Sequence, residues 1–258
     1  MSNEMVNNVE HGSVNNCLFG IEELSLDINT RMSNQQSPFG RFLFTHSGVI
    51  AIITEKGRHL VPPEQVIWLP HSINYQLVAA TFTEIICYSL NQKTQTNLND
   101  KATVLAVDSF LKKLINESIT SQIMSYGEPA LHHLSHLLLN RLALATPLLL
   151  FLPALKDQRL LAITSRQQKF PALKTDLNAW GKFVHASPRT LSRLFKNETG
   201  MTYSQWKQIM LIHIAIIQLS LDESITVIAK SLGYESSSAF IYMFKKHMKI
   251  TPSHYLGD

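Results

Sequence analysis

Two segments of the C-terminal third repeat one pattern and decide the fold: LNAWGKFVHASPRTLSRLFKNETG (177–200) and ITVIAKSLGYESSSAFIYMFKKHMK (225–249). Each reads as a short helix, a turn, a serine that can cap the next helix, and a second helix with Phe-Lys towards its end. This is the layout of a helix-turn-helix unit. The apolar segment QWKQIMLIHIAIIQLSL (205–221) joins the two copies as a helix. Because any two short helices can imitate one such unit, the repetition is what predicts an all-α domain with two units.

The second helix of the first unit has one polar and one apolar face. Ser187 can cap this helix and Pro188 fits its first turn. At about 100° per residue, the apolar face holds Leu191, Leu194 and Phe195, and the polar face holds Arg189, Ser192, Arg193 and Lys196. Arginine can pair with guanine through two hydrogen bonds in a major groove. The polar face is therefore a candidate DNA-reading surface, and an ordinary solvated helix face is the alternative.

The second unit has the same division, with a different polar face. Ser236 or Ser237 can cap its second helix. The apolar side holds Phe240, Met243, Phe244 and Met248, and the polar side holds Ser238, Tyr242, Lys245 and Lys249. Hydroxyl groups can bond to base edges or to phosphates but discriminate less than arginine does. We therefore expect this helix to dock on the DNA backbone and to read bases weakly.

The candidate DNA contacts divide into two sets. Base readout is expected from Arg189, Ser192 and Arg193, with weaker reading by Ser238 and Tyr242. Phosphate contacts are expected from Lys196, Lys207, Lys245 and Lys246.

The N-terminal part has a different pattern. Between residues 41 and 90, short runs rich in Val, Ile, Phe and Thr alternate with Gly and Pro, which predicts a small β-sandwich or barrel. Apolar residues at helical spacing then predict helices over 103–116 and 128–142, the first with Phe110 on its buried stripe. The predicted class is α+β, with a β-domain and helices before the all-α domain.

Charge is distributed unevenly along the 258 residues. Residues 1–155 carry 9 Lys/Arg against 12 Asp/Glu, whereas residues 156–258 carry 14 against 7. A basic half joined to a mildly acidic half is typical of a protein that meets a polyanion at one end. A chance imbalance on a solvated surface is the alternative.

Other features favour a cytoplasmic protein. The first 16 residues are polar and lack the order of a secretory signal, and the apolar run 142–155 is broken by Pro147 and Pro153 and too short to cross a bilayer. The two cysteines allow one disulfide, although reduced thiols fit a cytosolic chain better. No membrane contact is expected.

No catalytic constellation is visible. The sequence has no P-loop, no GxGxxG and no GxSxG. The HHLSH stretch places His132 and His136 one helical turn apart, but it reads better as a surface cluster than as a zinc site. Four aromatic residues of the β-region could line a small-molecule cavity or simply fill the core: Trp68, Tyr75, Phe82 and Tyr88.

The C-terminal segments resemble the DNA-binding domain of AraC/XylS-type transcription regulators. The resemblance rests on ASPRTLSRLFKNETGMTYSQW, ITVIAKSLGYESSSAF and FKKHMKITPSHY, with the signature positions Gly233, Tyr234, Ser238, Phe240, Phe244, Pro252 and Tyr255. It implies two helix-turn-helix units whose recognition helices enter successive major grooves. Four positions depart from the family. Ile209 and Leu211 stand where arginines are usual. Gly181 stands where alanine is usual, and we expect this glycine to add flexibility. Lys249 stands where glycine is usual.

Residues 41–90 resemble the cupin-type sensor domain of one branch of this family, through SGVIAIITEKGRHLVPPEQVIWLPHSINYQL. Cupins commonly bind a metal through histidines, but the corresponding positions here are Asn34, Gln36 and Tyr75, so no metal or other cofactor is expected.

The resulting prediction is a non-enzymatic, sequence-specific transcription regulator. Its predicted parts are a disordered tail (1–20), a cupin-like β-barrel sensor domain (21–98), a helical pair with a linker (99–155) and the DNA-binding domain (156–258). The resemblance implies double-stranded promoter DNA as partner, with RNA polymerase, a small-molecule effector and a second copy of the chain as further partners. The alternatives are a family member that acts through protein–protein contacts and a cupin-type enzyme.

Overall fold

The computed structural model describes residues 19–34, 39–71, 73–90, 98, 100–119 and 128–255. Residues 1–18 of the tail predicted over 1–20 therefore lie outside the described residues, and so does Gln36.

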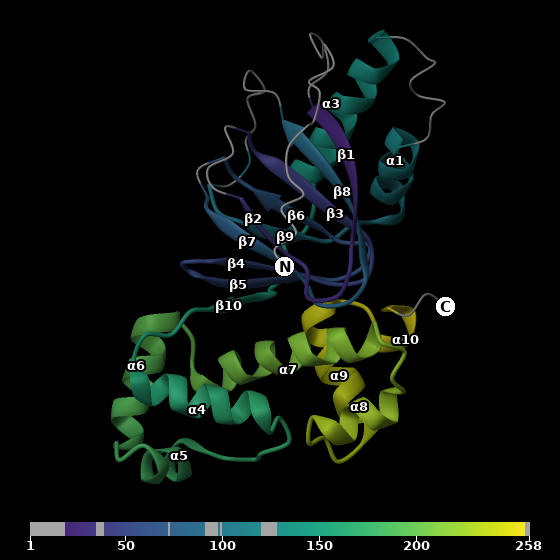
Figure 1. Ribbon diagram of the computed structural model, residues 1–258. Coiled ribbons are helices and arrows are strands. Elements are labelled where there is room, and N and C mark those ends of the chain that lie inside the picture. Colours follow the sequence, from purple (N-terminus) through teal and green to yellow (C-terminus); the bar gives the residue numbers. More distant parts are fainter. Residues whose placement is uncertain are drawn as a thin grey trace.

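The N-terminal part is a sandwich of two antiparallel five-stranded sheets (Figure 1). One sheet has the order β1 (Phe19–Leu26), β8 (Thr83–Leu90), β3 (Arg41–Ser47), β6 (Val66–Leu69) and β9 (Thr103–Leu105). The other has the order β10 (Phe151–Pro153), β5 (Gly57–Val61), β4 (Ile50–Thr54), β7 (Tyr75–Ala79) and β2 (Arg31–Asn34). Alternate residues such as Leu43 and Ile85 of the first sheet and Ile52 and Leu77 of the second share one buried core. The predicted fold class is confirmed.

Helices α1 (Ser109–Ile119) and α3 (Glu128–Leu144) lie beside the first sheet. They cover its outer face, where a second apolar cluster joins strand residues, including Trp68 and Tyr88, to Leu111 and Leu138 of the helices. Tyr88 Oη and Ser118 Oγ are 2.7 Å apart, which joins β8 to α1. Of the four aromatic residues considered for a cavity, Trp68 and Tyr88 thus fill the outer cluster, Tyr75 lies in the inner core and Phe82 is exposed.

The helix predicted over 103–116 is wrong in its first half. Residues 103–105 form β9, which pairs with β6, and helix α1 begins only at Ser109. Asp108 sets this start because its carboxylate accepts a hydrogen bond from the backbone N–H of Leu111 at 2.7 Å. Phe110, predicted on the buried stripe, is 47% exposed, and the Arg141 guanidinium lies over its ring.

The C-terminal domain is entirely helical. It contains α4 (Gln158–Lys169), α5 (Leu177–Phe183), α6 (Pro188–Thr199), α7 (Tyr203–Leu219), α8 (Ile225–Ser231), α9 (Ser237–Met248) and α10 (Pro252–Tyr255). Figure 1 shows α7 running along the sandwich, with the pair α5–α6 near one end and the pair α8–α9 near the other. Both pairs contact α7 and share one buried core with it, which contains the large side chains Trp180, Phe195, Trp206, Phe240 and Phe244. The two predicted helix-turn-helix units are therefore present as two packed pairs.

Strand β10 connects the two parts of the chain. It pairs with β5, with Phe151 opposite His59, and the chain then enters α4. Just before β10, the Leu150 carbonyl lies 3.0 Å from Nε2 of His213 on α7. Because His213 is buried, desolvation lowers its pKa to about 3 and keeps the ring neutral. No helix of the described residues is long and apolar enough to cross a membrane.

Candidate nucleic-acid interface

The recognition helix of the first unit is α6. Ser187 caps it, since its Oγ accepts a hydrogen bond from the backbone N–H of Thr190 at 3.1 Å, and Pro188 occupies the first turn. Leu191 and Phe195 are fully buried, and Phe195 packs near the rings of Tyr203 and Trp206. The apolar face is thus committed to α7, which leaves the opposite face outward.

The predicted contact residues of α6 all lie on the exposed face: Arg189, Ser192, Arg193 and Lys196. Their guanidinium, hydroxyl and ammonium groups belong to successive turns of one helix, so they can follow one groove. The ammonium group of Lys196 donates to the Gly200 carbonyl at 2.8 Å, across the end of the helix. It would have to leave that carbonyl, or share its protons, to reach a phosphate.

The recognition helix of the second unit is α9. Of the two candidate serines, Ser236 is the cap, because its Oγ accepts from the N–H of Ala239 at 3.2 Å. The apolar side is buried as predicted: Phe240, Met243, Phe244 and Met248. The predicted contact residues are exposed on the other side: Ser238, Tyr242, Lys245 and Lys246. Tyr242 is 75% exposed, so its hydroxyl and ring are free to meet a groove or a phosphate.

The turns of the two units have matching geometry. The N–H of Ala186 donates to the Gly181 carbonyl, and that of Tyr234 donates to the Ala229 carbonyl, each at 2.9 Å. These bonds make Gly181 and Ala229 equivalent. A Cβ on Gly181 would lie 2.4 Å from the Ala186 carbonyl oxygen, so glycine is required there by a close backbone approach. This steric need, and not the expected flexibility, accounts for the departure at position 181.

The same equivalence identifies two residues that the sequence reasoning missed. Lys182 on α5 and Lys230 on α8 follow the equivalent positions directly, and both are exposed near the end of the first helix of a unit. Aligning the two segments on their turns, and not on their recognition helices, would have paired these lysines. Both are further candidates for phosphate contacts.

Lys207 is placed differently from the expectation. Its ammonium group donates to the carbonyl of Leu173, and partial burial lowers the pKa of this lysine. The side chain therefore ties α7 to the α4–α5 connection and is poorly placed to meet a phosphate.

A buried hydrogen-bond chain fixes the first unit. The indole N–H of Trp180 donates to Tyr203 Oη at 2.7 Å, and Tyr203 donates to Oε1 of Gln167 at 2.7 Å. The amide nitrogen of Gln167 in turn donates to the Pro171 carbonyl at 3.0 Å. Because buried polar groups are costly when unpaired, this chain sets the relative positions of α4, α5 and α7.

The two positions that lack the family's arginines are buried. Ile209 is 6% exposed and Leu211 5%, and α7 contacts β10 on its sandwich side. Apolar side chains fit that packing better than arginines would. Both side chains therefore belong to the buried core, and these changes do not remove charge from the exposed faces of α6 and α9.

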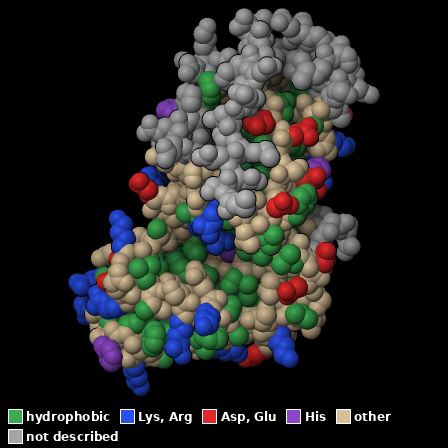
Figure 2. Space-filling model, in the orientation of Figure 1, with side chains coloured by type: hydrophobic (Ala, Val, Ile, Leu, Met, Phe, Trp, Pro, Cys, Tyr) green, Lys and Arg blue, Asp and Glu red, His purple; other side chains and the backbone are tan. Residues whose placement is uncertain are grey.

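Charged groups are segregated over the surface. In Figure 2, Lys and Arg side chains gather on the helical domain, whereas the visible Asp and Glu side chains lie mainly on the sandwich. Within the described residues, no three His, Cys, Asp or Glu side chains are grouped so that they could hold a metal ion. The side chain of His132 is outside the described part.

Comparisons with known proteins agree with this geometry. A family model described as "Helix-turn-helix domain" matches residues 180–258. The HTH-type transcriptional regulator NimR of Escherichia coli (strain K12) is 25% identical over 218 residues, which cover 84% of this chain and 80% of NimR. The HTH-type transcriptional regulator RipA of Corynebacterium glutamicum is 34% identical over 83 residues, only 25% of its length.

Solved structures of lower overall similarity were also found. ToxT from Vibrio cholerae is 13% identical with a TM-score of 0.38, and the alignment covers 92% of this chain and 97% of ToxT. The C-terminal domain of the response regulator AraT from Geobacillus stearothermophilus is 27% identical with a TM-score of 0.37, covering 39% and 84%. The family match and the relatives confirm the resemblance drawn from the sequence: this chain is a DNA-binding transcription regulator with an AraC-type helix-turn-helix domain.

Proposed function

We propose that this regulator reads promoter DNA mainly through α6 and holds it mainly through α9. The observation that supports this division is the composition of the two exposed faces. Arg189 and Arg193 can each bond a guanine edge, and Ser192 lies between them. On α9, Ser238 and Tyr242 discriminate weakly, while two lysines, Lys245 and Lys246, lie in the last turn.

The two helices would occupy successive major grooves. Helix α6 packs on α7 through Phe195 and Trp206, and α9 packs on α8, which contacts α7. One connecting helix, α7, therefore links the two recognition helices. Phosphate contacts by Lys196, Lys245 and Lys246 would fix the position on the duplex, and Lys182 and Lys230 would add to them.

A second candidate function is contact with another protein through the second unit. Val227 on α8 is 54% exposed and Tyr242 on α9 is 75% exposed, which gives this unit more exposed apolar surface than a phosphate-binding helix needs. This favours a protein partner such as RNA polymerase, bound beside the DNA.

The remaining parts of the proposal concern the whole chain. We propose a cytoplasmic, non-enzymatic protein in which the sandwich senses a small-molecule effector and can pair with a second copy. The boundaries 21–98, 99–155 and 156–258 stay a prediction for the sensor domain, the helical pair with linker and the DNA-binding domain. A cupin-type enzyme would need a bound metal, which elemental analysis of the purified protein can detect.

DNA binding can be tested by fluorescence anisotropy of the full chain on labelled DNA from upstream of its own gene. A scrambled duplex of equal length is the control, and both are titrated from low to moderate salt. We expect tighter binding to the upstream DNA and a steep loss of affinity with salt, because bound phosphates release counterions. Absence of binding to either duplex at low salt would favour the protein-contact function.

A further inference from the structure

A cavity of about 670 Å³ lies between the sandwich and the helical domain. Its size is within the range of about 300–1,000 Å³ that is usual for small-molecule sites. One wall comes from the second sheet and the segment around residues 100–104, one from the β10 segment, and one from the helical domain. The cavity therefore borders both halves of a regulator, so any occupant would contact both.

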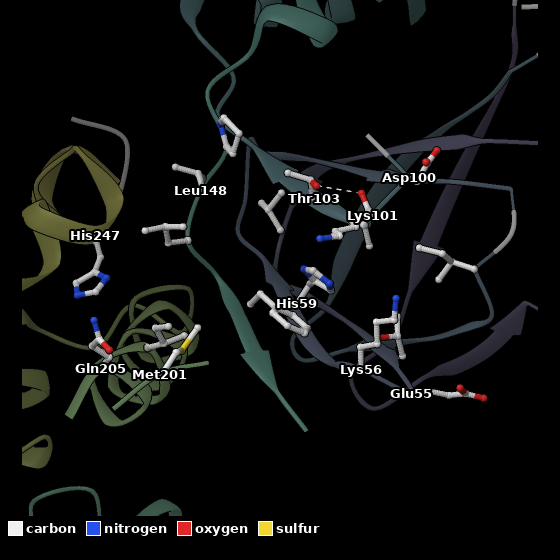
Figure 3. A pocket seen from close by; sticks show the side chains of 18 of the residues that line it. Glu55, Lys56, His59, Asp100, Lys101, Thr103, Leu148, Met201, Gln205 and His247 are labelled. Carbon is white, nitrogen blue, oxygen red and sulfur yellow. Dashed lines mark hydrogen bonds between the residues drawn. The ribbon is translucent and has the colours of Figure 1, made fainter. Parts of the chain in front are cut away.

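The sandwich wall carries two ammonium groups. Lys56 and Lys101 line the cavity, and neither forms an ion pair with a described residue. Glu55 and Asp100 are their chain neighbours, but Figure 3 shows both carboxylates directed away from the middle of the pocket, towards which the Lys101 side chain points. This side of the cavity thus favours a negative charge.

The middle of the cavity is apolar. His59 and Phe151 stack with ring centroids 4.5 Å apart, and Leu148 and Ile209 complete the surface. Burial lowers the pKa of His59 to about 4, so its ring is neutral near pH 7 and behaves as a flat, weakly polar surface. An apolar or aromatic body would be removed from water here.

The helical wall offers hydrogen-bonding groups without charge. Gln205 and Gln208 come from α7, and His247 comes from the last turn of α9. Nε2 of His247 is buried and has no hydrogen-bond partner among the described residues. Because an unpaired buried polar atom is unfavourable, this nitrogen marks a place where a ligand atom would be stabilised.

From these three walls we infer that the cavity binds a small organic anion with an apolar body. Its acid group would lie at Lys56 and Lys101, its body against Phe151 and Leu148, and a polar atom near His247. The inference rests on the proposed regulatory function and specifies where the effector binds and what kind of molecule it is. It places the site at the junction and not inside the sandwich, which leucine, isoleucine and valine side chains fill.

Such a ligand would couple the sensor to the DNA-reading elements. It would touch α7, which joins the two units, and the end of α9, one of the two recognition helices. A ligand shifts a conformational equilibrium only as far as it prefers one state. Any change in the angle between sandwich and helical domain would alter the distance between the groups it bonds, so its affinity depends on that angle.

The anion site can be tested on the full chain without DNA, which keeps the result independent of DNA binding. The probe is anilinonaphthalene sulfonate, an aromatic anion that fluoresces in apolar sites, and N-phenylnaphthylamine serves as its uncharged counterpart. We expect Lys56→Met combined with Lys101→Met to weaken binding of the sulfonate about tenfold and to leave the uncharged probe within about twofold. Lys113→Met, an exposed lysine of α1 outside the cavity, is the matched control.

The location can be tested by filling the cavity. Gln208→Trp should abolish binding of both probes. Leu149→Trp is the second variant, for use if Gln208→Trp does not fold, because position 149 is 72% exposed and should tolerate a large side chain. It should weaken binding of both probes. Circular dichroism of each variant checks the fold. Equal loss of both probes in the lysine variant would overturn the assignment of an anion. Unchanged binding in a folded tryptophan variant would overturn the site.

Discussion

The two helix-turn-helix units share a framework but place glycine differently. Both turns have a residue with positive φ, His185 in the first unit (φ 53°) and Gly233 in the second (φ 83°). Both recognition helices end in the left-handed region, the first at Gly200 (φ 71°) and the second at Lys249 (φ 65°). Each unit thus has glycine at one of its two strained positions and a larger residue at the other. Packing explains one of these choices, since a Cβ on Gly233 would lie 2.8 Å from the backbone of Ala172, whereas Gly200 has open space around it.

The two units differ most on the exposed faces of their recognition helices. Their buried faces both hold a fully buried phenylalanine, but their exposed faces hold two arginines in one unit and a serine with a tyrosine in the other. The framework is therefore set by the fold, and the exposed faces are free to differ in function.

The largest effect should come from the shared framework. Phe195→Ala and Phe244→Ala should each reduce the free energy of unfolding by about 3–5 kcal/mol, because both side chains are fully buried and leave a cavity. Urea denaturation followed by circular dichroism measures this, with Leu221→Ala, at an exposed position, as the control. A large loss for only one phenylalanine would show that the two units are not equivalent in packing.

The second largest effect concerns the stability cost of replacing the two glycines with positive φ, Gly233 and Gly200. Gly233→Ala should cost about 2–4 kcal/mol, because left-handed strain and the clash with Ala172 add. Gly200→Ala has the strain without the clash and should cost about 1–2 kcal/mol. Thermal unfolding of the two variants compares them directly, and equal losses would contradict the packing explanation.

The third effect is on DNA binding. Arg193→Ala should weaken binding to the specific site by about 1–3 kcal/mol if the arginine bonds a guanine. Tyr242→Ala should weaken it by less than about 1 kcal/mol, since a lone hydroxyl contact contributes less. Anisotropy on specific and scrambled duplexes measures both. An equal loss on the scrambled duplex would make Arg193 a phosphate contact, and a larger loss for Tyr242 would reverse the proposed division between the units.

The smallest expected effect is an increase in stability. Lys249→Gly should stabilise the chain by about 1 kcal/mol, because glycine adopts the left-handed conformation without the strain of a Cβ. Lys245→Gly, inside α9, should instead destabilise by about 1 kcal/mol. Thermal midpoints of the two variants test the sign, and destabilisation by Lys249→Gly would mean that its ammonium contact with the Lys246 carbonyl matters more than the strain.

Much of the helical domain could be predicted because its signals are local. Ser187 followed by Pro188, Gly200 after the last turn, and apolar residues at helical spacing fix α6 within its own segment. The exposure of Arg189, Arg193, Ser238 and Tyr242 follows from the same spacing, since only one face of each helix can be buried.

The features that were missed depend on distant partners. Residues 103–105 have a helical apolar pattern but form β9 because β6 offers an unpaired edge. Lys207 reads as a surface cation, yet the Leu173 carbonyl, 34 residues earlier in the sequence, accepts from it. Likewise the cavity exists only because the sheet, the β10 segment and α7 meet, and no single segment carries that information.

Strand β10 has a practical consequence for cutting the chain in two. A sensor fragment that ends before Phe151 would leave β5 as a bare edge, a surface prone to pairing with other chains. A helical fragment that begins after Pro153 would lack the Leu150 carbonyl and expose the neutral, normally buried ring of His213 to solvent. Three residues of strand thus belong to both halves at once, so neither half is self-contained and the boundary between them cannot be cut without cost to one side.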